Sequence, residues 1–385
     1  MATTPDDFLK FHRPSLGEAE ELAVLEVLRS GWLTTGPRTK AFEKRLAADR
    51  GCARGVGTNS CTAALHLALV AMGVGAGDEV ITSPITFAST ANVIVHTGAR
   101  PVFCDVQPDT LNMDPDSMAA MITPRTKAII AVHFAGHPCD MDEILRVAGA
   151  HGVPVIEDAA HAVEAEYRGR RVGSLARVAA FSFYATKNIT SGEGGMLTTN
   201  DAALADKAEV LALHGISRDA WKRYGDDGYQ HWDIIAPGYK YNMFDIQAAL
   251  VDKQMDRVDE FWERRRELTE QYDDALADLP ALKPLRRRDY VKASHHLYVV
   301  RVAEGEGGLS RDAFMNALQA QGVGVGVHFR AVHLHPYYRK TFGFKPGMLP
   351  IAEAAGDAVV SLPLYPSLRD DQVERVVATC RRVLR

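Results

Sequence analysis

Short apolar runs that alternate with amphipathic segments are the feature that most restricts the fold of this chain. Between residues 55 and 199, six strand-length runs are rich in Val, Ile or Phe: 79–82, 101–105, 127–132, 154–157, 179–183 and 196–199. Two of the segments between them, 62–73 and 142–152, repeat apolar residues at the three- and four-residue spacing of a helix. This alternation predicts an α/β fold with a mainly parallel sheet wrapped by helices.

The chain of 385 residues is longer than one hydrophobic core usually supports, which is about 250–300 residues. A charged stretch with an apolar stripe, 244–277, predicts a long helix that links two domains. Beyond it, 296–302 and 323–329 are expected to be strands that flank a helix at 311–321, with a last helix at 371–384. We therefore expect a large domain over 1–250, and a linker helix with a small α+β domain over 251–385.

Composition restricts the partners and the compartment. A net charge of −5 offers no broad attraction for nucleic acid or an anionic membrane, so the expected partner is a small molecule. The five cysteines have no zinc-ligand spacing, which indicates reduced thiols and no metal site. The first residues lack the pattern of a signal peptide, and no run of about 18 apolar residues occurs. We expect a cytoplasmic protein that does not span a membrane.

Polar residues follow the predicted strands in the segment 155–201. Asp158 ends one strand, Ser182 belongs to the next, and Lys187 falls in a polar turn just after it. Ligands of open α/β sheets bind at the carboxyl ends of the strands. Taken singly, Asp158 could equally cap a helix and Lys187 could be a solvated loop lysine.

Ten motifs in a fixed order separate these alternatives. They are GWLTTGP, TNSCTAALHLAL, SPITFASTANVIVHTGARPVFCDV, PRTKAIIAVHFAG, EDAAHA, SFYATKN, GEGG, GYKYNMFDIQAAL, GVGVHFRAVH and SLPLYP. Over nearly the whole chain, the sequence resembles the DegT/DnrJ/EryC1/StrS family of sugar aminotransferases, which depend on pyridoxal 5′-phosphate (PLP). The resemblance implies the aspartate-aminotransferase fold, also called fold type I.

The resemblance also assigns the catalytic groups. Lys187 is expected to hold PLP as a Schiff base and to move a proton during the reaction. Asp158 is expected to keep the pyridine nitrogen protonated, because a carboxylate stabilises the cation. His161 matches a position near the ring and its 3′-oxygen, and Phe87 matches the aromatic residue that stacks on the ring. For an isolated phenylalanine, core packing is the simpler explanation.

Further residues are expected to hold the phosphate. Ser60, Cys61 and Thr62 open a predicted helix, whose N-terminal N–H groups suit an anion. Ser182 adds a hydroxyl, and the resemblance implies that Asn242 reaches the phosphate from a neighbouring subunit. A homodimer is therefore expected.

The substrate side is indicated by fewer residues. His328, on the predicted strand 323–329, matches a family position at the mouth of the site, although a structural histidine is the alternative. Arg330 suits a donor carboxylate or a diphosphate, and Thr34 in GWLTTGP is a third candidate. An insert at 217–233 is a candidate for reshaping the sugar pocket. The adjacent His295 and His296 are expected to alternate across a strand, so they do not share a metal.

The function implied is transfer of an amino group, with L-glutamate as donor, to a nucleotide-linked keto sugar. Within the family, the motifs are most similar to enzymes that aminate C4 of UDP-linked 4-keto sugars, such as UDP-4-amino-4-deoxy-L-arabinose synthases. Two alternatives remain. A PLP-dependent sugar dehydratase of the same fold carries His in place of the lysine, so Lys187 argues against it. A non-catalytic regulatory protein is disfavoured because Lys187, Asp158 and Ser182 are all retained without a DNA-binding segment.

Overall fold

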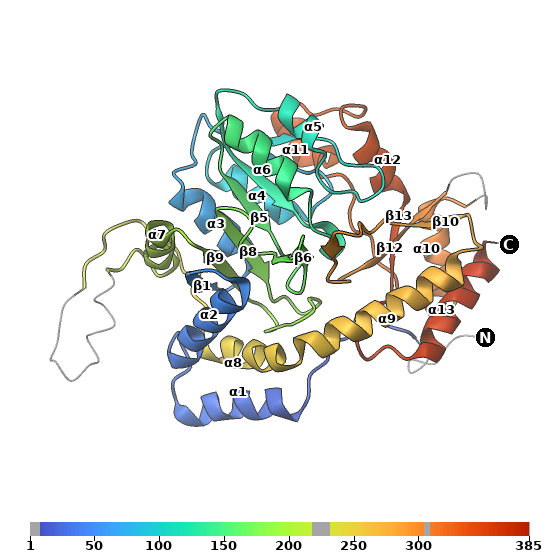
Figure 1. Cartoon of the computed structure of the whole chain (residues 1–385), viewed down its shortest axis with the longest axis horizontal. Helices are drawn as coiled ribbons and strands as arrows, with labels where there is room; N and C mark the ends of the chain where they lie inside the picture. The colour runs from blue at the N-terminus through green and yellow to red at the C-terminus, as the bar shows by residue number, and fades with distance from the viewer. Residues whose placement is uncertain (1–7, 218–231, 304–308, 385) are drawn as a thin grey trace.

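The computed structural model describes residues 8–217, 232–303 and 309–384, and its centre is a seven-stranded sheet (Figure 1). The strand order is β1-β9-β8-β5-β4-β2-β3. The bounds are β1 Arg54–Thr58, β2 Glu79–Thr82, β3 Arg100–Phe103, β4 Thr126–Val132, β5 Val155–Asp158, β8 Val178–Ser182 and β9 Gly195–Thr199. Each of the six predicted strands is present, with ends displaced by at most two residues.

The sheet is mainly parallel, as predicted. Neighbouring strands from β3 through β2, β4 and β5 to β8 pair in parallel. Strand β9 alone runs the other way, and it pairs antiparallel with both β8 and β1. The carboxyl ends of the parallel strands therefore lie along one edge of the sheet, which the loops that follow them can shape into a site.

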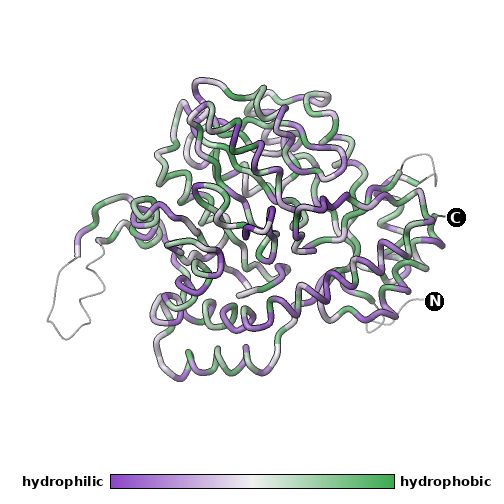
Figure 2. Tube along the Cα trace, in the orientation of Figure 1, coloured by the Kyte–Doolittle hydropathy of each residue, from purple (hydrophilic) through white to green (hydrophobic). Residues whose placement is uncertain are grey.

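Successive side chains of each strand point to opposite faces, and both faces are apolar. Ile129 and Phe181 pack on one face with α2 Pro37–Arg50, α5 Pro115–Ala120, α6 Met141–Ala150 and α8 Asp245–Gln254. Ile130 and Ala180 pack on the other face with α3 Cys61–Ala71, α4 Ala88–His96 and α7 Ala202–Ala212. The hydrophobic centre and the mixed outer helices are visible in Figure 2.

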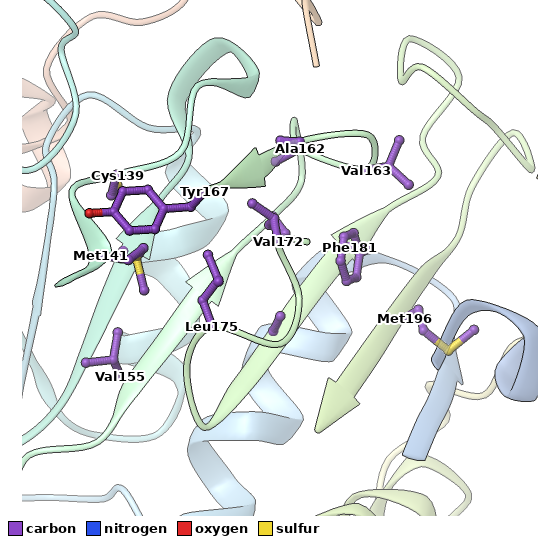
Figure 3. Close-up of a cluster of buried hydrophobic side chains, with 14 of the residues drawn as sticks. Cys139, Met141, Val155, Ala162, Val163, Tyr167, Val172, Leu175, Phe181 and Met196 are labelled. Carbon is purple, nitrogen blue, oxygen red and sulfur yellow. The ribbon is translucent and has the colours of Figure 1, made fainter. Parts of the chain in front are cut away.

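One of these cores also fixes the loop after β5. Tyr167, Val172 and Leu175 lie against Phe181 and Met141 in a single buried cluster (Figure 3). Tyr167 belongs to a small sheet of β6 Glu166–Tyr167, β7 Arg170–Arg171 and β11 Val291–Lys292. The segment after Asp158 is thus held by packing on one face of the large sheet.

The C-terminal part forms its own core around a three-stranded sheet, β10 Leu282–Pro284, β12 Tyr298–Val302 and β13 Val359–Leu362. Its helices are α9 Val258–Leu276, α10 Arg311–Ala320, α11 Pro336–Phe342, α12 Pro350–Ala358 and α13 Asp370–Val383. The side chain of Leu9 is part of this core. Backbone hydrogen bonds to Gly322 and Gly324 hold the N-terminal segment there. The division into 1–250 and 251–385 stays a proposal.

Three sequence expectations need correction. The stretch 244–277 is not one helix, because the 3₁₀ turn η4 Met255–Arg257 separates α8 from α9. No strand forms over 323–329, since Val323 bridges to Leu9 on one side and Gly326 to Ser361 on the other. His295 and His296 precede β12 and do not alternate across it. A run of apolar residues cannot build a ladder when each partner offers a single residue.

The N-terminal helix α1 Glu18–Ser30 packs on α8 through Ala23 and Val27. Most of the insert 217–233 lies outside the described residues. Within the described ranges, we find no helix whose length and apolar character would let it cross a bilayer.

Candidate active site

A cavity of about 590 Å³ lies at the carboxyl edge of the large sheet. Its walls come from the ends of β5 and β8, the first turns of α3 and α4, and the segments 11–12, 296–297 and 327–329. This volume is within the usual range for a small-molecule site, about 300–1,000 Å³. The cavity brings together most of the predicted residues: Ser60, Cys61, Thr62, Phe87, Asp158, His161, Ser182, Lys187 and His328.

Lys187 lies in the turn after β8, where its N–H donates to the Tyr184 carbonyl at 2.9 Å. Its side chain lines the cavity. Burial lowers the pKa of Lys187 to about 8, although Cys61 and Asp158 oppose this shift. A large share of the amine is therefore neutral near pH 8, which is the form that attacks a carbonyl carbon. Lys187 is therefore a half-buried residue of the cavity wall, and its role stays a prediction.

Asp158 is the last residue of β5 and is buried. Its carboxylate accepts hydrogen bonds from Thr90 Oγ1 at 2.8 Å and from the Ala160 N–H at 3.2 Å. Burial raises the pKa of Asp158, and the Thr90 bond acts in the opposite direction. No helix follows β5 directly, so Asp158 is not a helix cap.

The N-terminus of α3 opens into the same cavity. Ser60 is the N-cap, and its Oγ accepts the Ala63 N–H at 3.1 Å. The N–H groups of Cys61 and Thr62 belong to the first turn, whose donors have no intrahelical acceptor. Gly195 of β9 packs against this turn so closely that a Cβ would lie 2.4 Å from Ser60 C and 2.5 Å from Cys61 N. The arrangement suits a phosphate held by backbone donors.

Aromatic rings form the flat sides of the cavity. Phe87 is 64% exposed, so the core-packing explanation for this residue is wrong. The His161 ring lies 4.4 Å from the His296 ring and stacks on Phe329 at 6.1 Å. Among the described residues, the buried His161 Nδ1 has no hydrogen-bond partner. These residues fit PLP, which combines a flat ring with an aldehyde, a basic ring nitrogen and a phosphate.

Three predicted residues lie outside the cavity of the single chain. Thr34 and Arg330 are exposed, and neither lines the cavity. Asn242 bridges to Thr58 beside the α3 N-terminus, and its Nδ2 donates to Thr35 Oγ1 at 2.8 Å. Their roles stay predictions, as does that of His328, which lines the cavity and bonds Ser361 Oγ through Nδ1 at 2.9 Å.

Sequence reasoning missed several residues that the fold brings here. His296 Nδ1 donates to Asn188 Oδ1 at 2.8 Å, and Asn188 follows Lys187 directly. Phe11 and His12 line the cavity from the N-terminal segment, and nothing in their local pattern indicated this. No local pattern pointed to Thr90, which lies in the first turn of α4 and bonds Asp158 at the end of β5.

The fold and this cavity define a PLP-dependent aminotransferase of fold type I. Comparison with known proteins then supplies the family. Residues 14–381 match the model of the DegT/DnrJ/EryC1/StrS aminotransferase family, and the chain belongs to this family. It is a PLP-dependent sugar aminotransferase, which transfers an amino group from a donor to a sugar substrate, as the resemblance implied.

Individual relatives agree with this assignment. The chain is 49% identical to the spore coat polysaccharide biosynthesis protein SpsC of Bacillus subtilis, over 100% of this chain and 99% of SpsC. It superposes on the putative sugar aminotransferase Spr1654 of Streptococcus pneumoniae, in its PMP form, with a TM-score of 0.91 and 36% identity, covering 98% and 99% of the two chains. DesI, solved in the presence of its TDP-sugar product, gives a TM-score of 0.88 and 33% identity, covering 100% and 94%.

Proposed function

We propose that this enzyme transfers an amino group from L-glutamate to the C4 keto carbon of a UDP-linked sugar. The observation that carries the proposal is the joint placement of Lys187 and Asp158 in one cavity beside the free N-terminus of α3. A neutral amine, a buried carboxylate and an anion site are the three groups that a PLP-dependent transfer requires.

Bound PLP supplies the electron sink that makes the carbon next to the transferred nitrogen acidic. In our proposal, the Lys187 amine holds the cofactor between turnovers and carries the proton to and from that carbon. Asp158 would hold the proton on the ring nitrogen. Phe87 would stack on the ring, His161 would lie near the ring and its 3′-oxygen, and the first turn of α3 with Ser182 would bind the phosphate.

The nucleotide linkage is supported by one relative and one feature of the chain. DesI was solved in the presence of its TDP-sugar product. In this chain, Arg330 directly follows the cavity segment 327–329 and is exposed. An exposed guanidinium can bind a diphosphate through paired hydrogen bonds. The UDP and C4 assignments rest on the motif similarity alone.

A homodimer is supported by apolar side chains that the single chain leaves exposed. Leu22, Leu25 and Leu28 lie on one face of α1 and are 41–49% exposed. Trp32 and Leu33 extend this surface beyond the helix. Contiguous apolar surface of this kind is typical of protein interfaces. We propose that Asn242 reaches the partner's phosphate site across this interface, and that the dimer is cytoplasmic.

The dehydratase alternative is disfavoured, because Lys187 occupies the cavity where that class carries histidine. The regulatory alternative is disfavoured by the complete set of chemical groups that line the cavity.

The test is a single-turnover assay. Enzyme loaded with pyridoxamine phosphate is mixed with UDP-, dTDP- and GDP-linked keto sugars, and the return of the PLP absorbance is recorded. We expect the fastest return with a UDP-linked 4-keto sugar. Return with sugars that lack a nucleotide at the same rate would contradict the nucleotide linkage, and a preference for 3-keto sugars would contradict C4.

A further inference from the structure

The carboxylate of Asp158 is the end of a chain of buried hydroxyl groups. Thr90 Oγ1 lies 2.8 Å from Asp158 Oδ2, and Thr86 Oγ1 lies 2.7 Å from Thr90 Oγ1. Thr86 and Thr90 are 2% and 1% exposed, so water does not replace either bond. Thr90 lies in the first turn of α4 and Thr86 just before its N-cap Phe87, whereas Asp158 ends β5.

The direction of this chain depends on the charge of Asp158. An ionised carboxylate only accepts hydrogen bonds, so Thr90 must donate to Asp158. The Thr90 oxygen is then free to accept, and Thr86 donates to it. Each bond polarises the next, which strengthens the donation to the carboxylate.

The other groups around Asp158 do not replace this support. Ala160 N–H reaches Oδ1 at 3.2 Å, and Cys61 Sγ is 4.0 Å from Oδ1. Lys187 and the imidazole of His133 are the titratable groups that favour the charged form, while the first turn of α4 contributes no acidic residue. Thr90 is the donor to Oδ2, so its loss leaves that oxygen buried without a partner among the described residues.

We propose that the Thr86–Thr90 hydroxyl pair is a positioning device that holds Asp158 charged and correctly oriented toward the pyridine nitrogen of PLP. This inference rests on the proposed role of Asp158. Thr86 and Asp158 line the cavity and Thr90 does not, so Thr90 acts through the carboxylate.

The test compares Thr90→Val, which keeps the shape and removes the donor, with Thr90→Ser, which keeps the donor. Enzyme is loaded with PLP labelled with ¹⁵N in the ring, and the ¹⁵N chemical shift reports whether the ring nitrogen is protonated. We expect Thr90→Val to move this shift toward the unprotonated value and to lower kcat on the order of tenfold, with KM for the donor unchanged. Thr90→Ser should restore the wild-type shift.

Two controls separate the possible failures. Thr82→Val removes another buried hydroxyl, which bonds the Ile130 carbonyl at 3.0 Å, and it should leave the shift unchanged. Asp158→Asn should move the shift fully. If Asp158→Asn has no effect, the proposed role of Asp158 is wrong. If Asp158→Asn moves the shift but Thr90→Val matches Thr82→Val, the positioning role alone is wrong. Should Thr90→Val not fold, Thr86→Val removes the hydroxyl that donates to Thr90. A smaller ¹⁵N shift in the same direction is then expected, and an unchanged shift would overturn the proposal.

Discussion

The chemistry of this enzyme depends on how single residues are surrounded. Lys187 lies among protein groups that solvate a positive charge poorly, and Asp158 loses water at the same site. Burial therefore moves both groups toward their neutral forms, and their mutual attraction opposes that change. The balance leaves a lysine that is reactive at moderate pH.

The pH dependence of cofactor attachment follows from this balance. The pKa of Lys187 is lowered to about 8, so the amine is mostly protonated below that pH and mostly neutral above it. We expect the rate at which the apoenzyme attaches PLP, measured by borohydride trapping, to rise with pH and to level off above about pH 8 to 9. A rate that still climbs tenfold per pH unit at about pH 9.5 would indicate an ordinary lysine with a pKa near 10.4.

Replacement of the lysine tests the assignment itself. We expect Lys187→Ala to fold and to bind PLP noncovalently, but to lose turnover, because no amine remains to attach the cofactor or move the proton. Borohydride reduction and peptide mapping of the wild type should place the pyridoxyl label on Lys187. The exposed Lys44→Ala on α2 is the matched control and should behave as wild type. A label on any other lysine would contradict the assignment.

At the scale of elements, the site depends on close packing of β9 against the first turn of α3. At Gly195 an added Cβ would lie within 2.5 Å of three backbone atoms, and backbone cannot move aside as a flexible side chain can. The α3 N-terminus and its free N–H groups are therefore positioned by a glycine on a different element.

We expect Gly195→Ala to displace the α3 N-terminus, weaken PLP binding at least tenfold, and destabilise the protein by about 1–3 kcal/mol. The cofactor affinity is measured by titration of the apoenzyme, and the stability by denaturant unfolding. Gly149→Ala on α6, where nothing lies within 4 Å of the added Cβ, is the control. Equal PLP affinity in the two variants would show that this packing does not shape the phosphate site.

At the scale of the whole molecule, assembly decides whether the site is complete. Asn242 lies beside the α3 N-terminus but does not line the cavity of its own chain. If it serves the partner's site, mixed dimers of Lys187→Ala and Asn242→Ala chains place both lesions in one site and leave the other intact.

We expect each variant alone to be inactive and the equimolar mixture to recover about a quarter of wild-type turnover, because half of randomly paired dimers are mixed. Subunit exchange is verified with differently tagged chains. No recovery after proven exchange, or a fully active monomer in sedimentation, would refute the shared site. Both variants must first be shown to fold, since Asn242 also bonds Thr35 within its own chain.

Sequence alone predicted the large sheet well because its strands are buried on both faces and are continuous apolar runs. The prediction was wrong at 323–329, where strand formation depends on the neighbouring segments available for pairing and not on the local pattern. Residues 323–327 alternate valine with glycine, and each neighbour of the segment 323–329 offers only one pairing residue, so the segment stays irregular. The prediction of one helix over 244–277 was wrong at Met255–Arg257, where no proline or glycine in the sequence indicated a break.

The sequence by itself determined the sheet, the family and the residues that the chain order places at strand ends, Asp158 and Lys187 above all. These features depend on local periodicity and on motifs, both of which are properties of short continuous segments of sequence. Only the tertiary structure decided that Thr90 supports Asp158, that His296 lies on His161, and that Phe11 and His12 close the cavity. Such contacts join segments far apart in the chain. Local sequence patterns do not distinguish among the many possible long-range pairings, and the close packing of the whole molecule selects one of them.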